Sequence, residues 1–357
     1  MREDFDAPLA GLTTMRVGGP ADRIVTVESA DELVDAIREV DDAGEPMLVL
    51  SGGSNLVIAD EGFRGTVVRV AGRGVKVESK DACSGATVRV AAGEPWDDVV
   101  AMAVAEGWSG VEALSGIPGC AGSTPVQNVG AYGQEVADTI AQVRVWDRTS
   151  ARVRTLAAAE CGFGYRDSMF KRGAGRWVVL EVVFQLPLST RSAPIRYADL
   201  AAALDVGEGE RVPLAAAREA VLDQRRRRGM VLDEADHDTW SCGSFFTNPL
   251  LTASDFERLE RRVADRLGPE APAPPRWDGP EGVKTSAAWL IERAGFAKGF
   301  GMPGPAALST KHTLAVTNRG GASARDIVNL ARTVRDGVQA AFGVRLVNEP
   351  VLVGLAL

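Results

Sequence analysis

The segment Ser115–Gly133, SGIPGCAGSTPVQNVGAYG, constrains this chain more than any other stretch. It is dense in glycine, contains two prolines and carries no charged side chain. Glycines at this density let the backbone adopt positive φ and approach a ligand closely, with main-chain N–H groups directed at it. The segment lacks the Lys-Ser/Thr of a phosphate loop and the strand–GxGxxG–helix order of a dinucleotide fingerprint. A long irregular surface loop is the simplest interpretation, but the interleaved Gln127, Asn128 and Tyr132 favour a loop that wraps a flat polar heterocycle.

The bulk composition narrows the class of protein. A chain of 357 residues predicts two or three domains. A net charge of −8 and a pI near 5.1 argue against a nucleic-acid binder. Four dispersed cysteines and two histidines predict a reducing compartment and no metal site. The acidic first residues do not resemble a signal peptide and no apolar run reaches membrane-spanning length, so we expect a cytoplasmic protein that binds neither membrane nor nucleic acid.

Periodicity predicts a mixture of helices and strands. Ser29 and Glu32 form a capping box before a helix, and a second long helix is expected over Ala324–Phe342. Alternating residues predict strands within residues 66–92 and over Ile140–Trp146, and an apolar strand is expected over Trp177–Leu186. We also expect strands over Leu314–Thr317 and over Val344–Leu357, the latter interrupted by Asn-Glu-Pro. The first residues are interpreted as a polar arm, and residues 187–194 as a linker.

Four further segments combine glycine or aromatic residues with groups capable of chemistry. Ser51-Gly52-Gly53-Ser54-Asn55-Leu56 follows a predicted strand and can cradle an anion, although alone it would be an ordinary hairpin turn. The others are residues 164–171 (GYRDSMFK), 243–249 (GSFFTNP) and 347–351 (VNEPV). Each of these three segments also has an ordinary interpretation when it is taken alone. The arginine of GYRDSMFK could pair with the neighbouring aspartate, and the serine of GSFFTNP could cap a turn. The glutamate of VNEPV could lie at a strand edge. The basic run Arg225–Arg228 ends a predicted helix, where a solvated face is the default interpretation.

Five motifs closely resemble those of the bacterial UDP-N-acetylenolpyruvoylglucosamine reductases, the MurB family, and occur in the same order. They lie at residues 51–56, 115–133, 164–171, 243–249 and 347–351. The resemblance covers nearly the whole chain. Ser123-Thr124 departs from the small residues usual in the family, and Arg228 stands where a lysine is common. Arginine keeps the charge of lysine but not its geometry, so the arginine at position 228 affects the expected contacts to phosphate.

The resemblance implies an α+β fold, with a two-subdomain FAD-binding region of the PCMH/vanillyl-alcohol-oxidase type and a C-terminal α+β substrate-binding domain. It places FAD-binding subdomain 1 at residues 1–70, with the strand 343–357 returning to it. Subdomain 2 is expected at 71–206 and the substrate-binding domain at 207–342.

The implied activity is the reduction of UDP-N-acetylglucosamine enolpyruvate to UDP-N-acetylmuramate, with FAD as cofactor and NADPH as reductant, in peptidoglycan synthesis. Through it the chain would serve cell wall biogenesis, cell shape and cell division. The residues implied to bind FAD lie in the first two motifs: Ser51, Gly52, Gly53, Ser54, Asn55, Leu56, Ser115, Gly116, Pro118, Gly119, Gly122, Ser123, Gln127, Asn128, Gly130, Ala131 and Tyr132.

The same resemblance assigns the chemistry. Reduction of an enolpyruvyl ether places charge on the substrate carboxylate, which a cation must stabilise, and an acid must then protonate the α carbon. By the matching motifs, Arg166 is the cation, Ser244 is the acid and Glu349 assists in orienting the substrate and stabilising the intermediate. The implied contacts to substrate or NADPH are Tyr165, Arg225, Arg228, Asn248, Lys298 and His312, the last two by looser alignment.

Two alternative functions remain at this stage. An FAD-dependent oxidase or dehydrogenase of the same fold would share the flavin loops, but the motifs at 243–249 and 347–351 argue against it. A non-catalytic nucleotide-binding or RNA-binding protein could use the run Arg225–Arg228, but the acidic net charge and the absence of aromatic–basic interleaving argue against it.

Overall fold

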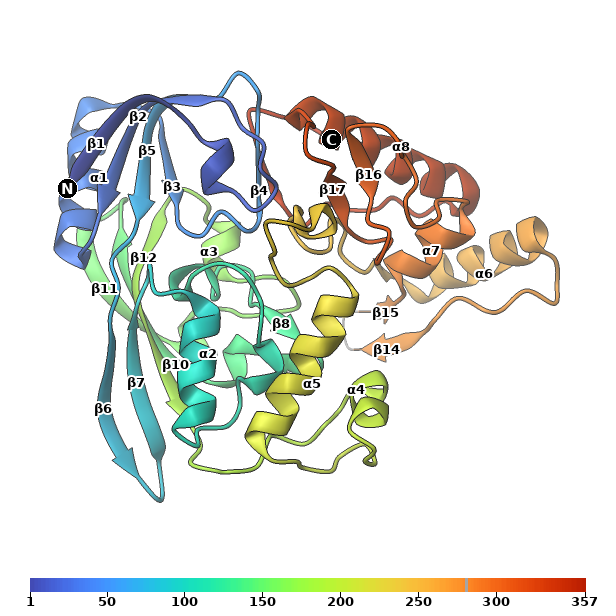
Figure 1. Cartoon of the computed structure of the whole chain (residues 1–357), viewed down its shortest axis with the longest axis horizontal. Coiled ribbons are helices and arrows are strands. Elements are labelled where there is room, and N and C mark those ends of the chain that lie inside the picture. Colours follow the sequence, from blue (N-terminus) through green and yellow to red (C-terminus); the bar gives the residue numbers. More distant parts are fainter. Residues whose placement is uncertain (280–281) are drawn as a thin grey trace. The chain divides into compact units, whose positions relative to one another are not determined.

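The computed structural model describes residues 1–279 and 282–357. The chain divides into two compact units, each assembled from separate stretches of sequence. The first unit comprises residues 1–7, 21–53 and 63–231, and the second comprises residues 8–20, 54–62 and 232–357. Helices and sheets occur in both units (Figure 1), so the α+β prediction is confirmed.

A four-stranded sheet in the first unit has the order β1-β2-β5-β3 and is covered by helix α1. Half of the predicted capping box is present: Ser29 accepts the main-chain N–H of Glu32, but the Glu32 carboxylate accepts the N–H of Glu28 instead of that of Ser29. Gly44 ends α1 in the left-handed conformation. The elements are β1 (Arg2–Pro8), β2 (Pro20–Val27), α1 (Ala30–Ala43), β3 (Met47–Leu50) and β5 (Phe63–Val70).

A five-stranded antiparallel sheet, β11-β10-β12-β7-β6, forms the largest layer of the first unit. The central strand β12 is buried along most of its length, and helix α2 packs into the same core. The β6–β7 hairpin forms one edge of this sheet, and β7 pairs with β12 from Ala86 to Ala91 (Figure 1). The elements are β6 (Val75–Asp81), β7 (Gly85–Ala91), α2 (Trp96–Ala105), β10 (Ile140–Asp147), β11 (Arg152–Ala157) and β12 (Trp177–Leu186).

Short elements between these strands shape the ends of the sheets. The hairpin of β8 (Gly130–Ala131) and β9 (Gln134–Glu135) lies within the glycine-rich region, and α3 (Met169–Arg172) follows the third motif. Helices α4 (Ala198–Ala203) and α5 (Leu214–Arg227) contact each other and share a small core. The 3-10 turns of this unit are Glu112–Leu114, Ala121–Ser123, Val136–Asp138 and Ala158–Glu160.

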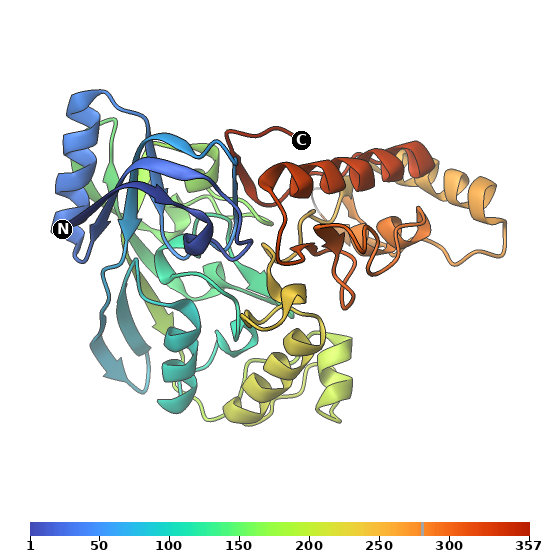
Figure 2. The same cartoon turned by 45° about the horizontal axis from the view of Figure 1, so that its top comes forward.

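The second unit is built around α8 (Ala324–Phe342), which spans the range predicted from the sequence. Ser323 and Asp326 form a capping box at its start, and Gly343 ends it with a φ of 73°. Helix α6 (Ala253–Leu267) lies beside α8 (Figures 1 and 2), and α7 (Ala287–Arg293) completes the layer. The remaining elements are β4 (Leu56–Ile58), β13 (Leu250–Leu251), β14 (Trp277–Gly279), β15 (Gly282–Lys284), β16 (Ala306–Leu308), β17 (Val316–Asn318), β18 (Val351–Val353) and the 3-10 turns Ala10–Leu12 and His237–Thr239.

Three local predictions differ from the structure. The first residues form the edge strand β1 rather than an arm, and the strand expected at Leu314–Thr317 begins at Val316. The strand expected over Val344–Leu357 is limited to Val351–Val353, because Pro350 has no N–H to donate to a ladder. That short strand pairs in parallel with β4. Since β3 pairs with β5 instead, the segment between β3 and β4 is not a hairpin turn. None of the helices described is both long and apolar enough to cross a membrane.

Candidate active site

The two segments predicted to bind flavin contact each other in the first unit. A Cβ atom at Gly52 would lie 2.5 Å from the Cα of Gly119, so position 52 has no room for a larger residue unless the backbone moves. Gly122 is equally close to Ala92, the residue after β7, and a Cβ there would lie 2.4 Å from the Cβ of Ala92. The glycine-rich loop is therefore fixed against both the β3–β4 segment and the end of β7.

This contact leaves main-chain donors available for a ligand. Gly53 and Gly119 have φ values of 59° and 114°, which favour glycine. Among the described residues, the N–H groups of Gly53 and Gly119 donate no hydrogen bond. Paired glycine turns with free N–H groups form an anion-binding nest, which suits the pyrophosphate of a dinucleotide such as FAD.

Asn128 connects the glycine-rich loop to the third motif. It is buried, with a φ of 47°. Its side-chain amide donates to the carboxylate of Glu135 at 2.7 Å and to the Gly164 carbonyl at 3.0 Å, and it accepts the N–H of Ala137 at 3.1 Å. A buried amide with this many partners fixes the loop conformation.

Arg166 lies against the same loop. Its guanidinium donates to the main-chain carbonyls of Gly130, at 2.5 Å, and Asn128, at 3.4 Å. It also lies 5.4 Å from the ring centroid of Tyr165. Ser168 caps α3 and donates to the Val126 carbonyl at 2.5 Å. The third motif therefore places a cation beside the glycine-rich loop.

A cationic group lies at the end of α5, close to the start of this loop, where a Cβ at Gly116 would lie 3.6 Å from Arg225 Nε. Burial lowers the pKa of Arg225 to about 10, and its guanidinium donates to the Met230 carbonyl at 2.8 Å. Arg228 forms an ion pair with Asp199 at 2.7 Å. Burial raises the pKa of the Tyr132 phenol, and the charges of Arg225 and Arg228 act against that rise. Tyr132 therefore lies within the electrostatic reach of both arginines.

Tyr197 belongs to this group and was missed by the sequence reasoning. Its ring contacts that of Tyr132 edge to face, with centroids 5.4 Å apart and planes at 84°. It precedes α4, next to the stretch interpreted as a linker. The sequence contained a signal for this residue: the chain has only three tyrosines, and the other two lie in predicted site motifs.

In the second unit, the motifs at 243–249 and 347–351 pair with each other. The N–H of Glu349 donates to the Phe245 carbonyl at 2.9 Å, and that of Thr247 donates to the Val347 carbonyl at 3.0 Å. Ser244 is the residue before Phe245, so the pairing brings the predicted acid and the predicted glutamate into neighbouring strand-like segments. The side-chain amide of Asn55 donates to the Glu349 carbonyl at 3.3 Å, which adds part of the first motif to this group.

The remaining predicted residues of the second unit lie on other elements. The side-chain oxygen of Asn248 accepts the N–H of Ala287 at 3.0 Å, at the start of α7. Lys298 is exposed in the loop after α7. His312 follows β16, and its N–H donates to the buried Ser309 hydroxyl at 3.3 Å. Burial raises the pKa of the Cys242 thiol, two residues before Ser244, to about 12, which disfavours the reactive thiolate form.

The predicted site is thus divided between the units. Arg166, Tyr165, Arg225 and Arg228 belong to the first unit with the glycine-rich loop, whereas Ser244, Glu349, Asn248, Lys298 and His312 belong to the second. The motif at 51–56 is shared, with Ser51–Gly53 in the first unit and Ser54–Leu56 in the second.

The fold and the glycine-rich cradle define a flavoprotein oxidoreductase. Residues 21–156 match the FAD binding domain, and residues 234–353 match the C-terminal domain of UDP-N-acetylenolpyruvoylglucosamine reductase. The chain is 58% identical to the UDP-N-acetylenolpyruvoylglucosamine reductase of Thermobifida fusca, over 99% of this chain and 98% of the relative. It is also 58% identical to the Salinispora arenicola enzyme, over 99% and 96%.

A solved structure gives the same result. The reductase (MurB) of Thermus caldophilus matches with a TM-score of 0.64 and 26% identity, over 99% of this chain and 98% of that one. The chain belongs to the UDP-N-acetylenolpyruvoylglucosamine reductase family, and it is an FAD-dependent enzyme.

Proposed function

We propose that this chain reduces UDP-N-acetylglucosamine enolpyruvate to UDP-N-acetylmuramate with NADPH as reductant, and that the three predicted catalytic residues carry out the protein's part of the chemistry. The observation that carries the assignment of residues is the pairing of the Ser244 and Glu349 segments through the Phe245 carbonyl. Near-complete alignment with relatives of that name supports the substrate.

FAD, when bound, supplies the hydride that adds to the substrate alkene. The N–H groups of Gly53 and Gly119 offer donors for its pyrophosphate. The residues assigned to the flavin are those of the two motifs, Ser51–Leu56 and the named positions from Ser115 to Ala131. Tyr132, which the resemblance implied to bind the flavin, is instead assigned to the substrate, because its ring lies against Tyr197 and within reach of two arginine charges.

Arg166 is assigned to the charge that develops on the substrate carboxylate. A guanidinium presents several N–H groups in a fixed plane, so it can keep its bonds to the loop carbonyls and still donate to a carboxylate. Because those bonds orient the group in advance, little reorganisation is needed as charge develops.

Ser244 is assigned to the proton transfer and Glu349 to orientation of the substrate. A serine hydroxyl is a weak acid, so its neighbours must stabilise it as the proton leaves. The short ladder between the two segments gives Ser244 a fixed backbone position, which proximity catalysis requires.

Arg225, Arg228, Tyr132 and Tyr197 are assigned to the diphosphate of the substrate. Arg225 is a buried cation, and the two phenols lie against each other near the arginines. Charge-assisted hydrogen bonds from guanidinium and phenol groups suit phosphate oxygens. Tyr165, Asn248, Lys298 and His312 are assigned to the remaining contacts with substrate or NADPH.

We assign FAD binding to residues 1–206 with the C-terminal segment 343–357, in two subdomains divided after residue 70, and substrate binding to residues 207–342. The product is a precursor of peptidoglycan, so the reaction would serve cell wall biogenesis, cell shape and cell division. Its place would be the cytoplasm, and the four free cysteines are consistent with a reducing compartment.

An anaerobic titration of the purified holoenzyme tests this proposal. NADPH is added until the flavin absorbance is bleached, and UDP-N-acetylglucosamine enolpyruvate is then added without oxygen. Return of the absorbance is the expected result. If only air restores the absorbance, the enzyme is a flavoprotein with another acceptor, such as an oxidase, and the proposal fails.

A further inference from the structure

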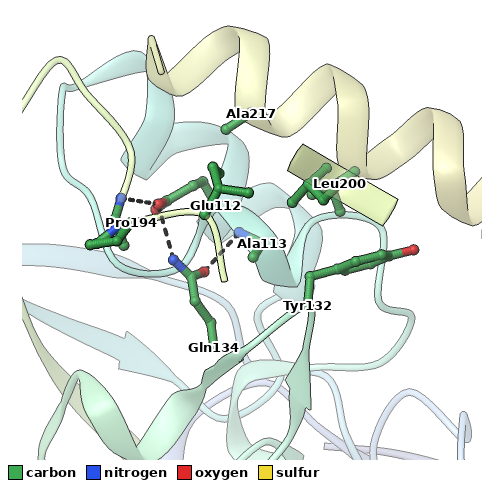
Figure 3. Close-up of a pocket in the computed structure, with 10 residues that line it drawn as sticks. Glu112, Ala113, Tyr132, Gln134, Pro194, Leu200 and Ala217 are labelled. Atoms are coloured by element: carbon green, nitrogen blue, oxygen red, sulfur yellow. Dashed lines mark hydrogen bonds between the residues drawn. The ribbon is translucent and has the colours of Figure 1, made fainter. Parts of the chain in front are cut away.

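We propose that Glu112 is a positioning residue: its buried carboxylate holds the two chain segments that carry Tyr132 and Tyr197, and it thereby shapes the diphosphate subsite. The inference rests on the proposed function for the identity of the ligand. The contacts that carry it all lie within the first unit (Figure 3).

Glu112 is a charged residue in an apolar setting. Its relative exposure is 2%. Oε2 accepts the N–H of Gly110 at 2.6 Å, and Oε1 accepts the N–H of Ala193 at 2.6 Å and the Gln134 side-chain amide at 3.0 Å. A buried carboxylate is costly unless donors satisfy it, and these three bonds offset that cost.

The first segment leads to Tyr132. Gln134 donates to Glu112, and its side-chain oxygen accepts the Ala113 N–H at 2.8 Å. Gln134 begins β9, which pairs with β8 across the two-residue turn Tyr132-Gly133. Both turn residues have positive φ, 49° and 82°, the geometry of a tight hairpin. Fixing Gln134 therefore fixes the turn that presents the Tyr132 ring.

The second segment leads to Tyr197. Ala193 donates to the same oxygen, Oε1, that accepts from Gln134. The chain on either side of Ala193 is held by Ser192, which donates to the Val212 carbonyl at 2.7 Å, and by Ile195, which donates to the Glu210 carbonyl at 2.8 Å. Tyr197 is reached two residues after Ile195 and directly precedes α4.

The two segments meet around a small cavity. Glu112, Gln134, Tyr132 and Leu200 are among the residues that line it (Figure 3), and its volume of about 10 Å³ is room for one water molecule at most. Little empty space is available to absorb a shift of either segment. A displacement at Glu112 would therefore move the Tyr132 and Tyr197 rings relative to each other.

The test measures binding of UDP and UMP to the oxidised holoenzyme by calorimetry, for the wild type and for Glu112→Gln, Glu112→Asp and Glu219→Gln. Glutamine at position 112 replaces one carboxylate oxygen, an acceptor, by an amide group that donates. Aspartate keeps the negative charge, but its shorter side chain brings the carboxylate less close to its donors. We expect both Glu112 variants to bind UDP roughly tenfold more weakly, with a smaller change for UMP, since the loss of one such hydrogen bond has about this effect. Glu219 is exposed on α5, and its variant is expected to match the wild type.

Kinetic readouts separate positioning from general structural damage. For the Glu112 variants we expect the KM for the UDP substrate to rise, while flavin content and the rate of flavin reduction by NADPH stay as in the wild type. A loss of flavin content, or of the rate of flavin reduction by NADPH, as large as the loss of UDP binding would overturn the inference. The residue would then support the whole unit. Unchanged UDP affinity in well-folded variants would overturn it as well.

A second variant keeps the inference testable if changes at Glu112 prevent folding. Gln134→Leu removes only the connection to the Tyr132 hairpin, and we expect weaker UDP binding with normal flavin content. Unchanged UDP affinity in this variant would contradict the inference. If the wild-type holoenzyme itself does not bind UDP, the proposed function fails together with the inference. If the wild type binds UDP and the variants bind it equally well, only the inference fails.

Discussion

The guanidinium of Arg166 donates to the main-chain carbonyl of Gly130 at 2.5 Å, which joins the third motif to the glycine-rich loop. A cation assigned to the substrate is thus held by the backbone of the segment assigned to the flavin. Hydrogen bonds thus join the loop assigned to the flavin to the group assigned to charge stabilisation, so a change in the loop conformation would also change the position of the cation.

Arg166→Lys should slow substrate reduction while leaving flavin reduction by NADPH nearly unchanged. Lysine keeps the charge but cannot bond both loop carbonyls and a carboxylate in one plane. We expect reoxidation of the reduced flavin by substrate to fall on the order of a hundredfold, as when one oxyanion donor is lost. Stopped-flow measurement of the two half-reactions checks this, and equal slowing of both would remove Arg166 from the assigned role.

Ser244→Ala should abolish product formation. The variant should still bind FAD and be bleached by NADPH, because the hydroxyl is assigned only to protonation of the substrate. Anaerobic addition of substrate should then restore no flavin absorbance. Ser254→Ala, an exposed serine on α6, is the matched control and should behave as the wild type. Normal product formation by Ser244→Ala would contradict the assignment.

Gly52→Ala should weaken flavin retention. The added Cβ would lie 2.5 Å from the Gly119 Cα, so the two flavin segments must separate. We expect the flavin-to-protein absorbance ratio after gel filtration to fall by a factor on the order of ten, since an overpacked contact costs about 1–3 kcal/mol. Gly321→Ala is the control, because nothing lies within 4 Å of its added Cβ and its φ is not positive. Full flavin content in Gly52→Ala would show that the cradle does not depend on this contact.

Asp147→Asn should reduce the stability of the first unit in a pH-dependent way. Arg176 donates to both oxygens of this buried carboxylate at 2.9 Å, and these bonds, aided by the Ser150 hydroxyl, hold the pKa of Asp147 well below its ordinary value. A lowered folded-state pKa means that the stabilisation is complete above the unfolded pKa, near 4, and is lost as the pH falls through the folded value.

Urea unfolding of wild type and Asp147→Asn at several pH values checks this expectation. The difference should be largest at neutral pH, at about 1–3 kcal/mol for a buried acceptor deprived of its charge-assisted bonds, and it should narrow below about pH 4. A difference that stays constant down to pH 3 would mean that ionisation of Asp147 is not the cause.

The fold could be predicted where local patterns decide it. Helix α8 and the cap of α1 follow from apolar spacing and from Ser-x-x-acid boxes. Strand β1 was missed because REDFDAP is an exposed edge with no apolar alternation. The terminal strand was predicted too long because an apolar run does not show which of its residues have a ladder partner.

The site could be predicted as a set of motifs but not as contacts. Nothing local in GSFFTNP or VNEPV indicates that Glu349 donates to Phe245, since the pairing depends on tertiary structure. Glu112 and Tyr197 were missed for a related reason. Each is an ordinary residue by its neighbours in sequence, and only burial for the first and ring contact for the second set them apart.

The parallel pairing of β4 with β18 also affects the order in which the protein can be made. Asn55, just before β4, donates to the Glu349 carbonyl although the two residues are 294 positions apart. During synthesis from the N-terminus, β4 must wait for nearly the whole chain to be translated before its partner exists. The second unit therefore completes its fold only late in translation, and until then residues 8–20 and 54–62 lack the partners that they have in the folded unit.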